Sequence, residues 1–336
     1  MKTIHILYLA VFGLFIGGCS SQKSRKESFS VSTNQETPAN LNVLKNHIET
    51  IIKDKKATVG VAVILNGKDT LTINNTEKYP MMSVYKFHQA LAVCDYLEKK
   101  NIPLTTLLHL DKKFFKPDTY SPLRDKYPQG DLDLSLGELL TYTLQLSDNI
   151  ACDILFDYIG GVNVVDEYIH SLGIKEVSIT TTEDEMHQDM EDCYENWSTP
   201  LAAASLLEIF TTNDSLRNEY TDFVKRTMIE CQTGKDRLVA PLSENGIIIG
   251  HKTGTSDKNS RGEYIGTNDI GFVTLPDGTR YTIAVFVKNS QEEMDANAKI
   301  IADISAAVYQ FVCQKLPAPS SEKKLSLTNK TGNNEN

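Results

Sequence analysis

The sequence predicts an α+β fold, an α/β sandwich in which an antiparallel sheet flanked by terminal helices carries an inserted all-helical lobe. Two observations support this prediction. Strand-like segments occur near the two ends of the folded region, at residues 58–73 and 246–288. Between them, apolar residues recur at helical spacing. We expect the strands from both ends to share one sheet, which makes the helical middle an insertion.

The folded region is expected to begin with a helix at 41–53 and a strand pair at 58–65 and 70–73. The residues Asn66-Gly67-Lys68-Asp69 between these strands are typical of a tight turn. Three helical stretches follow. Their apolar positions are Phe87, Ala90, Leu91, Cys94 and Leu97, then Leu136, Leu139, Leu140 and Thr143, then Ala202, Leu206, Ile209 and Phe210.

The C-terminal part returns to strands, which we expect at 246–255, 268–275 and 280–288. The residues Pro276-Asp277-Gly278 supply the turn between the last two strands. A closing helix is expected from about residue 292 to 315. Its apolar face contains Ala296, Ile300, Ile304, Ala307 and Phe311.

Composition and charge exclude several classes of protein. The 336 residues are 40% hydrophobic and 23% charged, which is typical of a globular chain large enough to bury a core without metal or disulfides. The formal net charge of −10 provides no basic field for nucleic acid. The 7 histidines form no H-E-x-x-H motif and the cysteines no paired C-x-x-C. We therefore expect no metal, no cofactor and no nucleic-acid partner.

The N-terminus resembles a bacterial lipoprotein signal. Lys2 precedes an apolar run at 4–16, and small residues stand directly before Cys19. We expect cleavage before Cys19 and lipidation of its thiol. The alternative is an uncleaved membrane anchor, but about 15 apolar residues is short against the roughly 20 that a spanning helix needs. Either interpretation predicts export to the periplasm or cell envelope, with membrane contact through the anchor only.

These segments divide the chain into a signal at 1–18, a flexible tether at 19–39, one folded domain at 40–316 and a polar tail at 317–336. Within the domain, we expect an α/β lobe formed by residues 40–80 together with 230–316, and a helical lobe at 81–229. Five cysteines remain after processing, and their pairing is left open. They are Cys94, Cys152, Cys193, Cys231 and Cys313.

The first chemical motif is Ser83-Val84-Tyr85-Lys86, at the expected start of a helix. A spacing of three puts Ser83 and Lys86 on one helix face, so the lysine can activate the serine without a histidine. The free N–H groups of a helix start favour developing negative charge. A single match is weak, because an exposed lysine beside a capping serine is more common. The same pattern recurs in the polar segments at Ser20, Ser320 and Ser321.

Two further motifs are equally weak alone. Ser147-Asp148-Asn149 follows an apolar helical stretch and contains ordinary turn residues. Lys252-Thr253-Gly254 lies inside a strand pattern, where glycine often marks close approach of another backbone or a ligand. A second K-T-G at Lys330 lies in the polar tail. Their significance comes from the order of all three motifs.

Taken together, S-x-x-K, S-D-N and K-T-G in this order resemble the motifs of class A β-lactamases and penicillin-binding proteins. The resemblance covers residues 40–316 and implies the serine β-lactamase and penicillin-binding-protein transpeptidase fold. It implies that Ser83 opens the lactam ring and becomes acylated, with Lys86 as its proton-handling neighbour. Whether Lys86, or Glu183 acting through water, is the base for acylation is left open.

The resemblance also implies roles for the other motif residues. Ser147, assisted by Lys252, passes a proton to the departing lactam nitrogen. Asn149 binds the substrate side-chain amide and helps to hold Lys86. The backbone N–H groups of Ser83 and Thr255 form the oxyanion hole. The remaining substrate-binding positions are Tyr120, which walls the mouth of the site unless it is an ordinary surface tyrosine, together with Thr253, Gly254, Thr255 and Ser256.

Deacylation distinguishes a lactamase from a penicillin-binding protein, because only the lactamase needs a base that drives water rapidly onto the ester. Glu183 is the best match to the family's deacylating glutamate, and Glu185 is its rival. Asp184 is expected to be solvated, as charge runs usually are. The presence of Glu183 favours the lactamase over a D-Ala-D-Ala carboxypeptidase or a non-catalytic β-lactam sensor.

The loop around Glu183 departs from many class A members. Thr181 and Asn196 stand where an arginine and an aspartate form a pinning salt bridge, so the path of this loop is left open. His187 stands where an asparagine is common, and we expect it to contact the deacylating water. The altered loop and Thr255-Ser256 resemble the cephalosporinase branch, including extended-spectrum members.

Two further positions complete the comparison with the family. The cysteine pair that some members place behind the nucleophile is absent, because Ala90 and Leu140 occupy those places. Either Arg237 or Thr267 supplies a further contact to the substrate carboxylate. The resemblance as a whole implies a lipid-tethered, metal-independent monomer that hydrolyses β-lactam antibiotics, mainly cephalosporins, and confers resistance to them.

Overall fold

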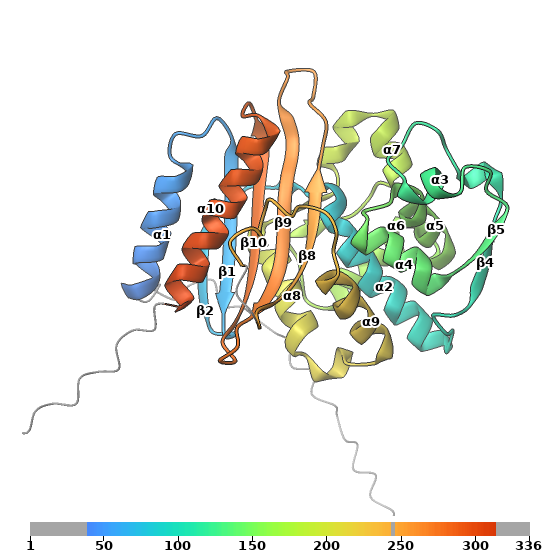
Figure 1. The fold of residues 1–336 in the computed structure, drawn as a ribbon, viewed down its shortest axis with the longest axis horizontal. Helices are drawn as coiled ribbons and strands as arrows, with labels where there is room; N and C mark the ends of the chain where they lie inside the picture. Colours follow the sequence, from blue (N-terminus) through green and yellow to red (C-terminus); the bar gives the residue numbers. More distant parts are fainter. Residues whose placement is uncertain (1–38, 243–245, 314–336) are drawn as a thin grey trace, which may run out of the picture. The chain divides into compact units, whose positions relative to one another are not determined.

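Five antiparallel strands form the central sheet of the protein, in the order β2-β1-β10-β9-β8 (Figure 1). The computed structural model describes residues 39–242 and 246–313. Strands from the two ends of the folded region pair directly, because β1 lies beside β10 with Val61 opposite Val285. The predicted single sheet is therefore confirmed. Its strands are β1 (Thr58–Leu65), β2 (Asp69–Ile73), β8 (Ile248–Thr255), β9 (Tyr264–Thr274) and β10 (Arg280–Ser290).

The β1–β2 hairpin has the turn that its sequence predicts. Asn66 and Gly67 adopt φ angles of 51° and 69°, the left-handed region that a two-residue hairpin turn requires. The prediction for β9 was wrong at its start, since the strand begins at Tyr264 and not at residue 268. Its first residues are held by pairing, with Thr267 opposite Thr255 of β8 and Tyr264 opposite Ser290 of β10. Long-range pairing of this kind leaves no local signature.

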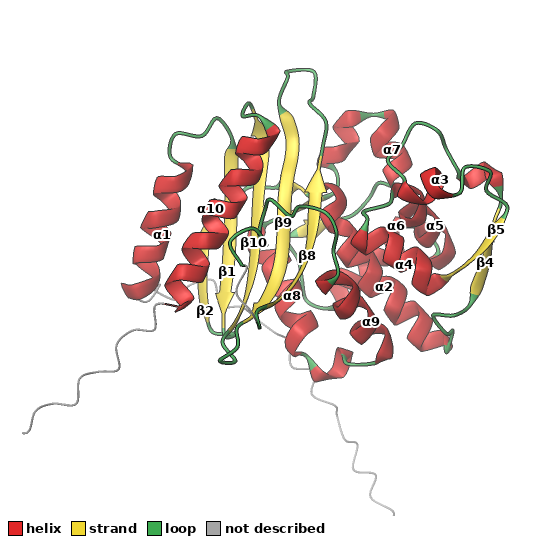
Figure 2. Ribbon diagram, viewed as in Figure 1, coloured by secondary structure: helices red, strands yellow, loops and turns green. Residues whose placement is uncertain are grey.

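Helices cover both faces of the sheet. On one face lie α1 (Ala39–Ile52) and α10 (Met294–Cys313), which pack against each other and close an apolar core with β1, β9 and β10 (Figures 1 and 2). On the other face, α8 (Pro200–Thr212) packs against β1 and β10. Thr199 caps the start of α8 by accepting a hydrogen bond from the N–H of Ala202. The sheet is therefore a middle layer between helices.

The second apolar core lies among the helices of the middle of the chain, around α2 (Tyr85–Lys100). This helix is buried on most of its circumference from Tyr85 to Cys94, as expected for a central helix. The other helices here are α3 (Pro122–Lys126), α4 (Leu136–Gln145), α5 (Asn149–Ile159), α6 (Val162–Ser171), α7 (Glu183–Gln188) and α9 (Glu219–Ile229).

The helical part also contains short strands that the sequence prediction did not include. The pair β4 (Leu107–Leu110) and β5 (Leu132–Ser135) forms one hairpin-like ladder. A second small sheet has the order β3-β7-β6 and ties the segment before α2 to the segment before α8. Its strands are β3 (Tyr79–Pro80), β6 (Val177–Ser178) and β7 (Trp197–Ser198). Runs of 2 to 4 residues are too short to show a periodic pattern.

Several predictions fall on other parts of the chain. The signal at 1–18, Cys19, most of the tether and the tail at 317–336 lie outside the described residues, so their roles stay predictions. Within the described ranges, none of the helices is both long and apolar enough to cross a membrane. The five cysteines of the described residues are all free.

Candidate active site

Ser83 lies in a single turn of 3₁₀ helix, Met82–Val84, that leads directly into α2. Met82 adopts a left-handed φ of 48°, a conformation that costs free energy for a side chain of this size. The turn is fixed from β9, because the Asn268 side-chain amide donates to the carbonyl oxygens of Pro80 and Met81 at 2.8 and 3.1 Å. The serine is thus presented on a rigid turn at the edge of the helical part.

Gly254 of β8 allows the sheet to approach this turn. A Cβ atom at Gly254 would collide with the carbonyl oxygen of Met81 and would lie 3.3 Å from the backbone nitrogen of Ser83. Any other residue would push β8 away from the serine. The glycine of the third motif therefore brings the backbones of β8 and the Ser83 turn into contact.

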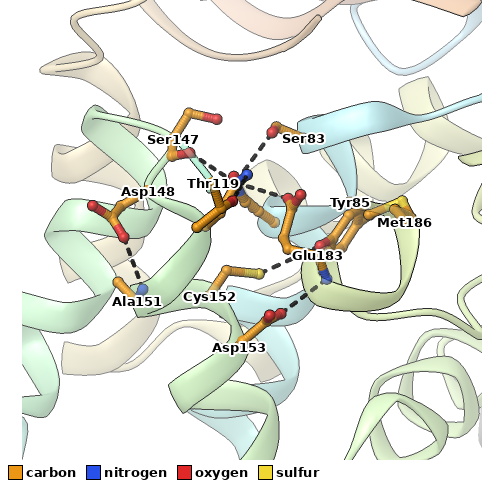
Figure 3. A network of polar contacts seen from close by, with 12 residues as sticks. Ser83, Tyr85, Thr119, Ser147, Asp148, Ala151, Cys152, Asp153, Glu183 and Met186 are labelled. Carbon is orange, nitrogen blue, oxygen red and sulfur yellow. Dashed lines mark hydrogen bonds and ion pairs between the residues drawn. The ribbon is translucent and has the colours of Figure 1, made fainter. Parts of the chain in front are cut away.

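Lys86 is the centre of the site, one turn into the helix from Ser83. Its Nζ donates to Ser83 Oγ at 3.1 Å, to the Ser147 carbonyl oxygen at 2.7 Å and to Asn149 Oδ1 at 2.6 Å. Glu183 Oε1 lies 2.8 Å from the same nitrogen. In Figure 3, the side chains of Ser83 and Glu183 accordingly point toward a common centre. Burial alone would lower the pKa of Lys86, but the Glu183 carboxylate raises it, so the lysine is an ammonium ion.

The second motif lies beside Lys252. Ser147 adopts a left-handed φ of 60° between α4 and α5, and its Oγ accepts a hydrogen bond from Lys252 Nζ at 2.9 Å. Lys252 is fully buried, and burial together with the nearby charge of Lys86 lowers its pKa to about 7. This amine can therefore exchange a proton with Ser147 near neutral pH.

Asp148 has a structural task that sequence reasoning missed. Its buried carboxylate accepts from the N–H of Ala151 at 2.8 Å, which caps α5, and from Ser121 Oγ and the N–H of Leu123 at 2.8 and 2.7 Å. It thereby joins the loop after Tyr120 to the Ser147 turn. Tyr120 itself is 57% exposed. Its role at the mouth of the site stays a prediction.

The choice between the acidic residues of α7 is decided by their contacts. Glu185 Oε2 accepts from the N–H and Oγ1 of Thr182 at 2.8 and 3.0 Å in a capping box, so Glu185 is used at the helix start. Asp184 pairs with Lys116 at 2.6 Å. Glu183 alone of the three reaches Lys86. The structure therefore favours Glu183 over its rival Glu185.

Asp153, one turn after Asn149 on α5, positions Glu183. One of its carboxylate oxygens accepts from the N–H of Glu183 at 2.9 Å, as Figure 3 shows, and the other accepts from the N–H of Asp184 at 3.0 Å. Burial and the Glu183 charge raise the pKa of Asp153 to about 7. The sequence motifs do not include Asp153, although its spacing of four from Asn149 places both residues on one helix face.

Asn196 replaces the salt bridge that the sequence lacks. Its Oδ1 accepts from the N–H groups of Thr180 and Thr181 at 2.8 and 3.0 Å, and its Nδ2 donates to the Thr181 carbonyl oxygen at 2.8 Å. The side chain is fully buried. The entry to α7 is thus held by uncharged hydrogen bonds. His187, near the other end of α7, is exposed, and its contact with the deacylating water stays a prediction.

Arg237 and Thr267, the two residues predicted for a further contact to the substrate carboxylate, differ in their surroundings beside the third motif. Arg237 Nη2 donates to Thr255 Oγ1 at 2.7 Å, and Nη1 donates to the carbonyl oxygens of Gly254 and Asn268 at 2.9 Å each. Thr267 is buried and its hydroxyl faces Met294 Sδ at 3.8 Å. The Thr255 hydroxyl is therefore bonded by Arg237, while the hydroxyl of its cross-strand partner Thr267 turns toward Met294, and the contact of either residue with substrate stays a prediction.

Two other predicted binding hydroxyls already have partners in the protein. Thr253 Oγ1 lies 2.6 Å from Thr233 Oγ1. Ser256 is buried, and its Oγ accepts from the N–H of Gly266 at 2.9 Å. Ala90 and Leu140 are both fully buried, so apolar packing occupies the region behind the nucleophile. In the described part of the chain, no three histidine, cysteine or acidic side chains are grouped so as to hold a metal ion.

Comparisons with known proteins agree with this geometry. The family model described as the beta-lactamase enzyme family matches residues 42–312. A beta-lactamase of Bacteroides uniformis is 44% identical over 267 residues, which cover 79% of this chain and 90% of that protein.

Solved structures give the same result. The TLA-1 extended-spectrum beta-lactamase is 47% identical with a TM-score of 0.78, over 81% of this chain and 98% of that one. A class A beta-lactamase from Bacteroides cellulosilyticus is 46% identical with a TM-score of 0.78, over 83% of this chain and 99% of that one. The predicted family and fold are confirmed. This chain belongs to the β-lactamase enzyme family, in class A, and is a hydrolase of β-lactams.

Proposed function

We propose that this β-lactamase acts mainly on cephalosporins, through an acyl-enzyme on Ser83 whose hydrolysis Glu183 assists. The observation that carries the proposal is the position of Lys86 Nζ, which lies 3.1 Å from Ser83 Oγ and 2.8 Å from Glu183 Oε1. One nitrogen thereby connects the nucleophile to a carboxylate that can accept its proton. This is the arrangement that an activated serine nucleophile needs.

Acylation begins when Ser83 Oγ attacks the lactam carbonyl. An ammonium group has no lone pair, so Lys86 accepts the serine proton only as it passes one of its own protons to Glu183. The oxyanion is stabilised by the backbone N–H groups of Ser83 and Thr255, where loss of one donor typically costs on the order of 100- to 1,000-fold in rate. The contact of Gly254 with the Ser83 turn supports this pairing of donors.

Ring opening needs a proton on the departing lactam nitrogen. Ser147 Oγ donates this proton and recovers one from Lys252 Nζ, which is 2.9 Å away. Before deacylation, Glu183 releases the proton gained during acylation and Lys252 regains the one it supplied, so the Glu183 carboxylate is free again. Water then attacks the ester and gives its proton to Glu183, and the departing Ser83 Oγ takes a proton back through Lys86. The carboxylate is suited to this step because Asp153 fixes the backbone at Glu183.

The substrate carboxylate is expected to bind Lys252, Thr253 and Thr255, with Arg237 holding Thr255 in place. Asn149 is expected to bind the amide of the substrate side chain. Its Oδ1 is held by Lys86 and its Nδ2 by Thr119 Oγ1 at 2.9 Å. Similarity to TLA-1, which is named an extended-spectrum enzyme, supports activity on extended-spectrum cephalosporins.

The test of the mechanism replaces Glu183 by Gln and follows cephalosporin turnover together with intact mass. Without the Glu183 charge, burial lowers the pKa of Lys86, so its free amine can take the Ser83 proton directly. We therefore expect the variant to accumulate a covalent adduct on Ser83 while steady-state turnover is lost. The matched control is Glu185→Gln, two residues along the same helix, which should turn over normally and only weaken the cap of α7. Undiminished turnover in E183Q would overturn the assignment of Glu183.

The same assay addresses the alternative functions. A chromogenic cephalosporin hydrolysed for many turnovers supports the lactamase mechanism. A penicillin-binding carboxypeptidase or a non-catalytic β-lactam sensor would release little more than one equivalent of product. The presence of a carboxylate beside Lys86 supports the multi-turnover outcome.

We further propose that the protein is a lipid-anchored monomer of the periplasm or cell envelope. The support is the sequence around Cys19, with small residues directly before the cysteine. Replacing Cys19 by Ala should move the β-lactamase activity from the membrane fraction to the soluble envelope fraction. Light scattering of the solubilised enzyme should give the mass of one chain. Unchanged membrane association in C19A would contradict the lipid anchor. A mass of two chains would contradict the monomer.

A further inference from the structure

A Cys–His–Asp cluster that the proposed mechanism does not use lies next to Lys252. It consists of Cys231, His251 and Asp269. His251 precedes Lys252 on β8, so the two side chains point to opposite faces of the strand. His251 Nδ1 lies 3.0 and 3.1 Å from the two carboxylate oxygens of Asp269 on β9, and both side chains are almost fully buried. The imidazole also interacts with the nearby Cys231 thiol through a side-chain hydrogen bond.

Cys231 reaches this position from the end of α9, which packs against β8 (Figure 1). The thiol follows the last turn of the helix, where the N–H of Cys231 donates to the Met228 carbonyl oxygen at 3.3 Å. Its Sγ also lies 3.4 Å from Thr233 Oγ1. The sulfur is therefore held between the imidazole and a hydroxyl, and it remains partly exposed.

The cluster is electrostatically arranged to hold a thiolate. Burial disfavours the imidazolium, but Asp269 outweighs it and raises the pKa of His251 to about 10. Burial likewise disfavours the thiolate, but the hydrogen bond and charge of His251 lower the pKa of Cys231 to about 7. Lys252 and Arg237 add positive charge near the sulfur, and the carbonyl end of α9 opposes them.

The other described cysteines lack this combination. Cys94, Cys152 and Cys193 are buried, and burial raises the pKa of each. Cys313 is exposed at the end of α10, which makes it an internal reference for an accessible thiol. Only Cys231 among these five combines partial access with a buried His–Asp pair.

We propose that Cys231 is a nucleophilic thiolate that undergoes exchange with small disulfides, and that the resulting adduct disturbs the substrate-carboxylate site through Thr233 and Thr253. In the exchange, Cys231 Sγ attacks one sulfur of the disulfide. A new S–S bond forms, the S–S bond of the reagent breaks, and the other half leaves as a thiolate. The reagent is the oxidant, so no further electron acceptor is required.

The coupling to the carboxylate site follows from a short chain of contacts. Thr233 Oγ1 lies 3.4 Å from Cys231 Sγ and 2.6 Å from Thr253 Oγ1. A group attached to the sulfur occupies the space beside Thr233 and displaces it. Thr253 then loses its hydroxyl partner, directly beside Lys252. The expected effect is weaker binding of the anionic substrate, seen as a several-fold rise in KM.

The test treats the full chain with 2,2′-dipyridyl disulfide between pH 5.5 and 9.5 and maps each adduct by peptide mass. Cys231 should react with a pH midpoint near 7, below the value of about 8.5 for an ordinary thiol, and labelling of the exposed Cys313 shows that the reagent is active. The KM for a cephalosporin should rise in the treated enzyme and return after reduction. Cys231→Ser should lose both the adduct and the sensitivity, and the matched control Cys313→Ser should keep both.

A variant at His251 tests the role of the imidazole. His251→Gln should raise the midpoint at Cys231 to 8.5 or above, because the positive partner of the thiolate is gone. If this variant does not fold, the wild-type midpoint still decides the question. The proposal is overturned if Cys231 remains unlabelled while Cys313 reacts, or if its midpoint lies near 8.5. Complete labelling at Cys231 with an unchanged KM would overturn the coupling to Thr253.

Discussion

Glu183 and Lys86 form a buried ion pair, with Glu183 Oε1 2.8 Å from Lys86 Nζ and side-chain exposures of 10% and 0%. Each charge compensates the other in a site that water barely reaches, and removal of either partner leaves an unpaired buried charge. The pair joins α7 to α2, so the proposed deacylating group and the Ser83 turn are held by one contact.

Lys86→Ala should abolish acylation where Glu183→Gln abolishes deacylation. Loss of the ammonium removes the route by which the Ser83 proton reaches Glu183, at a cost of about 100- to 10,000-fold in rate. Rapid-quench mass measurements should detect no acyl-enzyme burst in K86A and a full burst in E183Q. Lys99→Ala, at an exposed lysine that pairs with Asp95, serves as control. A fast burst in K86A would contradict the proposed proton route.

Asp153→Ala should impair both stability and deacylation. It leaves the N–H groups of Glu183 and Asp184 without their acceptors, which costs about 1–3 kcal/mol for each group that remains buried. Urea unfolding should report the stability, and decay of the acyl-enzyme should slow by about tenfold as Glu183 loses its orientation. Asp157→Ala changes an exposed residue one turn later on the same helix, and it should alter neither the stability nor the decay of the acyl-enzyme. Equal effects of the two variants would refute a positioning role for Asp153.

Asp153 should also contribute to the pH dependence of stability. Its pKa is raised from 3.8 to about 7 in the folded protein, so the folded state binds the proton more tightly than the unfolded chain. The stabilising contribution is therefore complete below about pH 4 and is lost as the pH rises through about 7. Asp153→Asn should flatten the unfolding free energy over this range, and an unchanged slope between pH 4 and 7 would count against the assignment.

Lys252→Arg should change the pH profile of kcat/KM for an anionic substrate. Burial and Lys86 lower the pKa of Lys252 to about 7, so the ammonium form that attracts the carboxylate and supplies Ser147 predominates below this pH. In the wild type, kcat/KM should fall as the pH rises through about 7. Arginine remains charged, so the pH profile of kcat/KM in the K252R variant should lose this decline, even if the variant is slower than the wild type. A wild-type profile that is flat from pH 6 to 8 would exclude this role.

Asn196→Ala should loosen the entry to α7. The variant leaves two N–H groups and one carbonyl oxygen near Thr181 unpaired, with an expected loss of about 2–4 kcal/mol in stability. The midpoint of thermal unfolding should fall, and acyl-enzyme decay should slow. Asn213→Ala, which removes a cap outside this loop, should cost about 1 kcal/mol and leave the decay rate unchanged. Wild-type stability in N196A would show that the loop is held elsewhere.

The sequence predicted those parts of the fold and site that depend on local patterns. The apolar strand followed by a tight turn at β1, the alternation in β10 and the helical spacing in α2 identified their elements. Ser83 and Lys86 are neighbours because they lie one helical turn apart. The capping box of Thr182 and Glu185 was also a local signal, and it would have separated Glu185 from Glu183.

Other relationships depend on contacts between distant segments. Asp153 binds backbone groups 30 and 31 residues away, and Arg237 binds Thr255 18 residues away. The start of β9 at Tyr264 is fixed by its partner strands. The tertiary fold decides such pairings, and no spacing rule predicts them.

The contact between Gly254 and the Ser83 turn has a consequence for evolution under antibiotic selection. A position without room for a Cβ atom offers no viable single substitution, so this junction cannot be remodelled in small steps. Tyr120, which is 57% exposed, can change size without disturbing a packed core. We expect adaptive changes in substrate range to accumulate at the exposed rim, while the junction of β8 with the nucleophile turn stays fixed in laboratory selection.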